Sequence, residues 1–130
     1  MRVILTAAAI GLTLAVPAQA LDLNAYRRAH KLPPLQFSSD LAAAAQWHAD
    51  DLAHRNRLDH KGFRERMRVI ASTAAENVLV GCETEDCAIR HWARSTHHRR
   101  NMLMKGVSRY GIASARSDKG RLYWVLELGN

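Results

Sequence analysis

The first 20 residues constrain the rest of the chain most, because they have the pattern of a leader that is removed on export. Arg2 gives a short positive start, and an apolar run from Val3 to Val16 follows it. Pro17-Ala18-Gln19-Ala20 then supplies the small-x-small pattern that signal peptidase recognises, so we expect cleavage after Ala20. The run is shorter than the ~20 apolar residues that a membrane span needs. We therefore expect a signal peptide over 1–20 and no transmembrane anchor after cleavage.

Cleavage would leave residues 21–130 as one domain outside the cytoplasm, either periplasmic or extracellular. Such a length suffices for one hydrophobic core, and no repeat, linker or second domain is visible. The net charge is +7 for the whole chain and +6 without Arg2, which favours loose association with anionic partners such as the cell envelope. Basic and acidic residues alternate, however, and no nucleic-acid motif appears, so we expect no specific nucleic-acid partner.

Two cysteines remain, Cys82 and Cys87, only five positions apart. In an oxidising compartment a close pair is most simply a disulfide. A zinc site at this place would need further ligands, and only His91 lies nearby. We predict the disulfide, which stabilises by roughly 2 kcal/mol in the chain-entropy description for so short a loop.

Hydrophobic periodicity and turn residues predict a mixed α+β domain with helices packed on a small antiparallel sheet. Helices are expected over 22–30, 38–55, 63–70 and 84–94, and strands over 76–80, 107–115 and 121–128, the last two joined by a hairpin turn at 117–120. His48 falls on the apolar stripe of the second helix, which favours a buried, hydrogen-bonded histidine over a ligand.

The densest chemistry lies between Trp92 and Leu103, where two imidazoles, a hydroxyl, an amide and several guanidinium groups occur in twelve residues. Imidazole titrates near neutrality, so this stretch could bind a metal or move protons. A solvated basic corner explains the same composition. Composition alone does not separate these two interpretations.

Short motifs along the chain resemble those of the CAP superfamily, the SCP-like extracellular domains, in their bacterial form. They occur in the family's order and cover nearly all of 21–130. The matching pieces are Leu23–Arg27, Leu41–Ala49, Leu58–His60, Ala75–Val78, Trp92–Leu103, Tyr110–Ile112 and Tyr123–Val125.

This resemblance implies a three-layer αβα sandwich with a small antiparallel sheet and a central cleft. It also implies that His60, Glu76 and His98 converge in the cleft as metal ligands, which their separations of 16 and 22 residues would not reveal. Two imidazoles and a carboxylate are a common set of ligands for zinc, and another divalent cation is an alternative. A hydrogen-bonded cluster that only joins helix to sheet remains open.

The chain departs from the family pattern at the cleft. Ser95 stands where animal members carry a second glutamate, and Leu126 stands where a glutamine is often found, so we expect modest metal affinity. Glu127 could compensate, but strand alternation directs it away from Trp124 and Leu126, and we do not count it as a ligand. Four residues are expected to support the cleft, or to serve as ordinary surface and capping residues: Asn77, Ser95, Arg99 and Asn101.

These features favour a binding module over an enzyme. The expected ligand is a divalent cation and, with it or in its place, a lipid, peptide or cell-envelope component. A metal-assisted hydrolase is the first alternative, but Glu76 would have to act both as a ligand and as the base. Electrostatic adhesion to an anionic envelope is the second.

Overall fold

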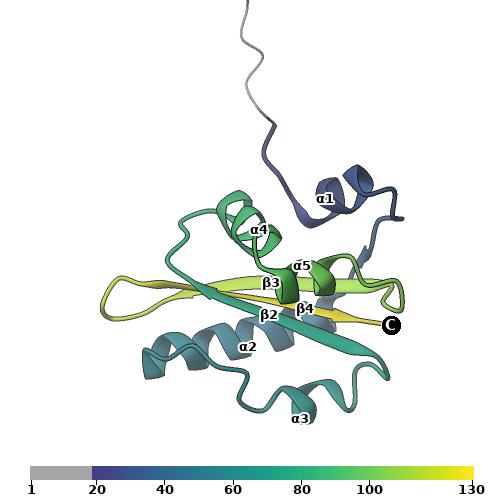
Figure 1. Cartoon of the computed structure of the whole chain (residues 1–130). Helices are drawn as coiled ribbons and strands as arrows, with labels where there is room; N and C mark the ends of the chain where they lie inside the picture. The colour runs from purple at the N-terminus through teal and green to yellow at the C-terminus, as the bar shows by residue number, and fades with distance from the viewer. Residues whose placement is uncertain (1–18) are drawn as a thin grey trace, which may run out of the picture.

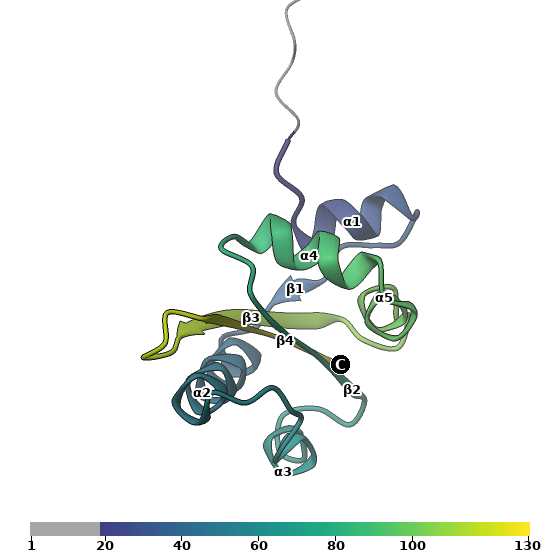
Figure 2. The same cartoon turned by 60° about the vertical axis from the view of Figure 1, so that its left-hand side comes forward.

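The computed structural model describes residues 19–130, so the predicted leader lies almost entirely outside the described residues. Five helices cover the two faces of a four-stranded sheet, with α1, α4 and α5 on one face and α2 and α3 on the other (Figures 1 and 2). The helices are α1 Leu23–Ala29, α2 Ser39–Arg55, α3 Phe63–Met67, α4 Glu85–Ala93 and α5 Thr96–Met102. The strands are β1 Gln36–Phe37, β2 Ala74–Val80, β3 Arg109–Arg116 and β4 Leu122–Gly129. This α+β sandwich confirms the predicted fold class.

The central strand β4 separates two hydrophobic clusters. Leu126 and Leu128 face α1, α4 and α5, whereas Tyr123 and Val125 face α2. The strand order is β1-β3-β4-β2, and the three long strands are antiparallel as predicted. The two-residue β1 pairs in parallel with β3, which makes the sheet mixed. A strand of two residues carries no periodicity that the sequence could have revealed.

Helix α2 packs unusually close to β3, and Gly111 permits this contact. A Cβ atom at Gly111 would lie 2.1 Å from the backbone nitrogen of Ala42, so no other residue fits without moving the helix. The Ser38 hydroxyl accepts a hydrogen bond from the Leu41 amide and caps the start of α2. These contacts fix the start of α2 against the sheet.

Arg27 joins α1 to the end of α5. Its side chain is buried, and Nη1 donates to the carbonyl oxygens of Met102 and Met104 at 2.9 and 3.0 Å. Nε donates to the carbonyl of Pro33 at 3.0 Å. A buried guanidinium needs such acceptors, and those of Met102 and Met104 lie at the C-terminal end of α5.

Most predicted elements are confirmed, and the main differences concern α3, β2 and α5. Helix α3 ends at Met67 instead of 70, and β2 begins at Ala74, two residues earlier than predicted. Helix α5 was not predicted at all. Its sequence, Thr-His-His-Arg-Arg-Asn-Met, buries only Met102, so it carries no apolar stripe.

The predicted disulfide is confirmed: Cys82 and Cys87 are bonded and hold the loop that enters α4. The carbonyl of Cys82 also accepts a hydrogen bond from Trp124 Nε1 at 2.8 Å. This loop is therefore tied both to the start of α4 and to the middle of the sheet.

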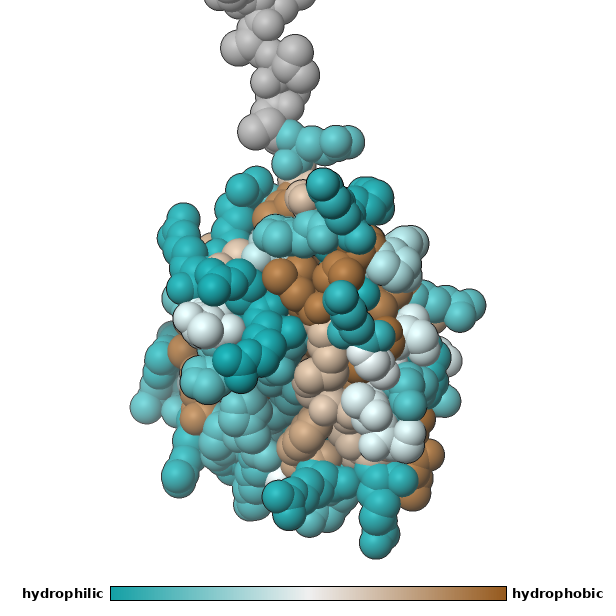
Figure 3. Space-filling view, turned by 45° about the vertical axis from the view of Figure 1, so that its right-hand side comes forward, coloured by the Kyte–Doolittle hydropathy of each residue, from teal (hydrophilic) through white to brown (hydrophobic). Residues whose placement is uncertain are grey.

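The outer surface is largely hydrophilic on the face that Figure 3 shows, where apolar side chains gather only in parts of the view. No helix within 19–130 combines the length and the apolar character that crossing a bilayer requires.

Trp92 should contribute strongly to stability, because it is fully buried and its Nε1 donates to the Val78 carbonyl at 3.2 Å. Trp92→Ala is expected to lower the free energy of unfolding by about 3–5 kcal/mol, as measured by urea denaturation. Trp47, whose exposed fraction is 60%, is the matched control, and Trp47→Ala should cost less than about 1 kcal/mol. Equal losses from the two variants would contradict the packing of α4.

Candidate functional site

Glu76 is the centre of a buried polar cluster beneath α2 and α3. It lies on β2 with only 1% of its side chain exposed, and both of its carboxylate oxygens have partners. Oε1 accepts a hydrogen bond from Nδ1 of His60 at 2.6 Å, and Oε2 accepts one from the guanidinium of Arg66. Both carboxylate oxygens are thus engaged by side chains from the segment between α2 and β2.

A second carboxyl group, that of Glu127, faces the same guanidinium. Glu127 lies directly opposite Glu76 in the pairing of β2 with β4, and its Oε1 accepts from Arg66 Nε at 3.4 Å. Burial, followed by the nearby charge of Glu76, raises the pKa of Glu127 to about 10. Burial alone would also raise the pKa of Glu76, but His60, the carboxyl of Glu127 and Arg66 outweigh it and lower that pKa. At neutral pH one ionised carboxylate therefore balances one guanidinium.

His48 borders this cluster from α2 as a neutral ring. It is fully buried, its Nε2 donates to the carbonyl of Asp59 at 2.9 Å, and Nε2 also lies 3.7 Å from Glu76 Oε1. Burial lowers the pKa of His48. The interpretation of His48 as a buried, hydrogen-bonded histidine is confirmed.

His60 is the member of the cluster that reaches solvent. Its side chain is 54% exposed, and because Nδ1 donates to Glu76, the other ring nitrogen of the neutral imidazole is left with a free lone pair. The same hydrogen bond raises the pKa of His60. Asp59, the residue before His60, is also held in place. Arg55 donates two hydrogen bonds to its carboxylate, at 2.8 and 3.0 Å.

His98 approaches from α5, on the opposite face of the sheet. Its carbonyl accepts from Asn77 Nδ2 at 3.0 Å, and Asn101 donates in turn to Asn77 Oδ1 at 2.9 Å. Burial lowers the pKa of His98, and the nearby imidazole of His60 lowers it further, so the ring is neutral at pH 7. Nδ1 of His98 is buried without a hydrogen-bond partner in the described structure.

The predicted site residues are thus brought together only in part. His60 and Glu76 are in contact, and His98 lies close enough for the charge of His60 to affect its pKa. Of the predicted supporting residues, Asn77 and Asn101 join β2 to α5 through a hydrogen bond. Ser95 is the N-cap residue of α5, but its side chain makes no capping hydrogen bond. The Arg99 side chain is exposed.

Sequence reasoning missed Arg66 and set Glu127 aside. Arg66 occurs among other basic residues in Arg64-Glu65-Arg66 and has no motif of its own. For Glu127, strand alternation gives the direction of the side chain correctly, but it does not reveal that the neighbouring strand presents Glu76. Only the register of β2 against β4 makes the two carboxyl groups neighbours.

Within the part of the chain that the structure describes, the donor set is incomplete as a metal site, and the carboxylate of Glu76 is already engaged. Among residues 19–130, no three His, Cys, Asp or Glu side chains are grouped so that they could hold a metal. Both oxygens of Glu76 are already used, one of them by a cation. A carboxylate that orients a histidine in this way is the usual outer partner of a metal-binding imidazole.

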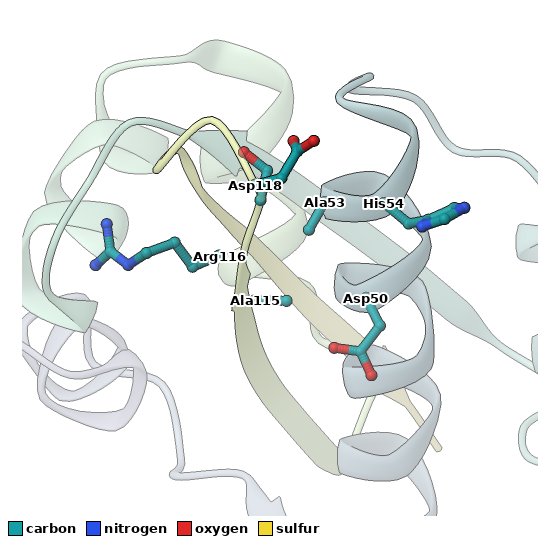
Figure 4. Close-up of a pocket in the computed structure, with 7 residues that line it drawn as sticks. Asp50, Ala53, His54, Ala115, Arg116 and Asp118 are labelled. Atoms are coloured by element: carbon teal, nitrogen blue, oxygen red, sulfur yellow. The ribbon is translucent and has the colours of Figure 1, made fainter.

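The surface hollow at His60 is basic. Its lining consists of Arg55, Arg57, Asp59, His60 and Lys61. A separate hollow between the end of α2 and the β3–β4 hairpin contains none of the predicted site residues; Asp50 and Asp118 approach it from these two elements (Figure 4). The hollow that His60 itself lines is therefore the basic one.

Comparison with known proteins gives the family. The model of the family described as "CAP: Cysteine-rich secretory protein family" matches residues 22–128. The chain belongs to the CAP family. A curated Bacillus subtilis relative, "Uncharacterized protein YkwD", is 26% identical over 102 residues, which are 72% of this chain and 40% of that protein.

Solved structures support the same fold. An outer surface protein from Borrelia burgdorferi superimposes with a TM-score of 0.75 at 16% identity, covering 83% of this chain and 86% of that one. An extracellular protein containing an SCP domain from Bacillus anthracis gives a TM-score of 0.71 at 22% identity, with 83% and 37% covered. The chain thus spans less than half the length of the two Bacillus proteins.

The unusual protonation of Glu127 predicts a distinctive pH dependence of stability. The folded state keeps this proton up to about pH 10, whereas an unfolded glutamate releases it near its ordinary pKa, so Glu127 makes stability fall as pH rises between these values. Glu127→Gln mimics the protonated group. From pH 5 to 8, the free energy of unfolding of Glu127→Gln, measured by urea denaturation, should increase relative to that of the parent chain by up to about 1.4 kcal/mol per pH unit.

The exposed Glu65 on α3 provides the control for this measurement. Glu65→Gln should follow the parent chain across the same pH range. A Glu127→Gln variant whose stability relative to the parent did not change with pH would contradict the neutral carboxyl.

Proposed function

We propose that this CAP domain is an exported binding module whose cleft offers the free ring nitrogen of His60, together with His98, to a divalent cation such as zinc. The observation that carries the proposal is the 2.6 Å hydrogen bond between His60 Nδ1 and the buried Glu76. It selects the tautomer whose Nε2 faces outward as a lone-pair donor. Glu76 then acts by orienting His60, instead of as the ligand that the family resemblance implied.

Three features support an imidazole-based cation site. His98 is neutral at pH 7, His60 is half exposed, and the partly buried His98 has a ring nitrogen without a hydrogen-bond partner in the described structure. Metal ligands must be deprotonated; His98 meets that requirement at pH 7, and His60 meets it above its raised pKa. A bound cation would offer a Lewis-acidic centre to which a ligand could attach.

The charges around the cleft indicate the rest of the ligand. Arg57 and Lys61 stand at the rim of the His60 hollow, so they favour a ligand that also carries an anionic group. A lipid head group, a peptide carboxylate or an anionic cell-envelope polymer has this chemistry. The leader pattern at 1–20 and the extracellular description of the Bacillus anthracis relative support export.

The geometry favours binding over hydrolysis. A hydrolase using this cleft would need a free general base, but both oxygens of Glu76 are engaged by His60 and Arg66. Simple adhesion through net charge would not require a buried carboxylate that orients one histidine.

Isothermal titration calorimetry with zinc tests the proposal on residues 21–130. Binding should be measurable at pH 7.5 and weaken sharply at pH 5.5, because the pKa of His60 is raised above the ordinary histidine value of about 6.5 and protons compete for the ring well before pH 5.5 is reached. His60→Ala and His98→Ala should each remove most of the binding. Glu76→Gln should weaken it by roughly 10–100-fold, as loss of an orienting partner does.

The adjacent His97, which is exposed, is the matched control, and His97→Ala should bind zinc like the parent chain. Equal losses from His97→Ala and His98→Ala would indicate an unspecific surface cluster. If both His60→Ala and His98→Ala still bound zinc like the parent chain, the proposed cation site at these two histidines would be wrong.

A further inference from the structure

The backbone nitrogen of Leu21 makes a contact that the cleft does not explain. It donates to Oδ1 of Asp86 at 2.5 Å, although the two residues are 65 positions apart. Leu21 is also the first residue after the expected cleavage site, since the small-x-small pattern ends at Ala20. The atom that processing would convert into a chain terminus is therefore already held by a carboxylate of α4.

The position of Leu21 is fixed on both sides of this nitrogen. Its side chain packs against the hydrophobic cluster beneath α1 and α4. Immediately after it, the Asp22 carboxylate accepts from the Ala25 amide at 2.7 Å and caps α1. Gln19 and Ala20, in contrast, are exposed, so the Ala20–Leu21 peptide bond lies at the boundary between exposed and packed chain.

The surroundings of this nitrogen are acidic. Asp22 caps α1, and Glu85 and Asp86 lie in the first turn of α4. One basic side chain is close: Nε of Arg90 lies 2.9 Å from Asp86. Burial and the charge of Asp22 raise the pKa of Glu85. Burial, together with the charges of Glu85 and Asp22, raises the pKa of Tyr110 on β3. An added positive charge here would be stabilised.

We propose that removal of the leader creates an α-ammonium group at Leu21 that forms an ion pair with Asp86, so that processing itself fastens the start of α1 to α4. Hydrolysis of the Ala20–Leu21 bond consumes one water and leaves a carboxylate on Ala20 and a protonated amine on Leu21. A neutral amide with one N–H then becomes a cation with three, and hydrogen bonds of charged groups are the stronger ones. The ion pair depends on the predicted leader and is independent of the cleft ligand.

The ion pair has a defined dependence on pH. The attraction of Asp86 should raise the α-amino pKa above the usual range of about 7.7–8.0. Its stabilisation is then fully present below that range and is lost as pH rises through the higher folded value. Asp86 itself stays ionised, because the hydrogen bonds from Arg90 and Leu21 lower its pKa.

The first measurement is the N-terminal residue of the protein recovered from the exported fraction of a bacterial host. Mass spectrometry should give Leu21. Any other first residue would overturn the inference. This outcome would leave the proposed zinc site and its experiments unaffected.

The second measurement compares chains that begin at Leu21 with chains that begin at Gln19, each with Asp86 or with Asp86→Asn. At pH 7 the Leu21 form should melt about 2–6 °C higher than the Gln19 form, as expected for one ion pair in a domain of this size. In Asp86→Asn the difference should vanish. Glu83→Gln is the control. It removes an exposed carboxylate in the loop before α4 that pairs with Arg116, and the melting difference between the two forms should persist in this variant.

A direct titration keeps the inference testable even if Asp86→Asn changes overall stability. The α-amino group of Leu21, labelled by isotopic methylation and followed by NMR, should titrate at higher pH in the parent than in Asp86→Asn. Equal titration midpoints, or a melting difference that persists in Asp86→Asn, would overturn the ion pair.

Discussion

The arrangement of the site depends on one buried interaction, the guanidinium of Arg66 held between the carboxyl groups of Glu76 and Glu127. Sheet register places these two carboxyls directly opposite each other, where two negative charges would repel strongly at low dielectric. The structure resolves this by keeping Glu127 protonated and Glu76 ionised against Arg66. Removing one partner of such a group leaves an uncompensated buried charge, so cleft and fold are coupled.

Edge strand β2 brings two layers of the sandwich to one place through successive residues. Glu76 faces the α2–α3 layer and holds His60, whereas Asn77 faces the opposite layer and holds the backbone of His98. Because side chains alternate along a strand, neighbouring positions can serve both faces of a sheet. Two histidines from separate layers can therefore approach each other at the edge of the sheet, although neither layer contains both.

The features that could be predicted from the sequence are those with a local signal. The caps and apolar stripes of α2 and α4, the β3–β4 hairpin and the Cys82–Cys87 bond all follow from residues close in the chain. The pairing of His60 with Glu76 came from family resemblance, since no local motif links them. The role of Glu127 arises from strand register, and that of Arg66 from the packing of α3 against the sheet, so neither has a local signal. Helix α5 escaped because tertiary contacts from Arg27 and Asn77 hold a helix without an apolar stripe.

The central claim is that Glu76 fixes the tautomer of His60 so that Nε2 faces outward, and nitrogen NMR of the imidazole tests it most directly. In the neutral ring at high pH, the account predicts a proton on Nδ1 and an unprotonated Nε2. Glu76→Gln should weaken that preference, because the amide no longer offers a charged acceptor. A neutral His60 that carries its proton mainly on Nε2 in the unmodified protein would contradict the account.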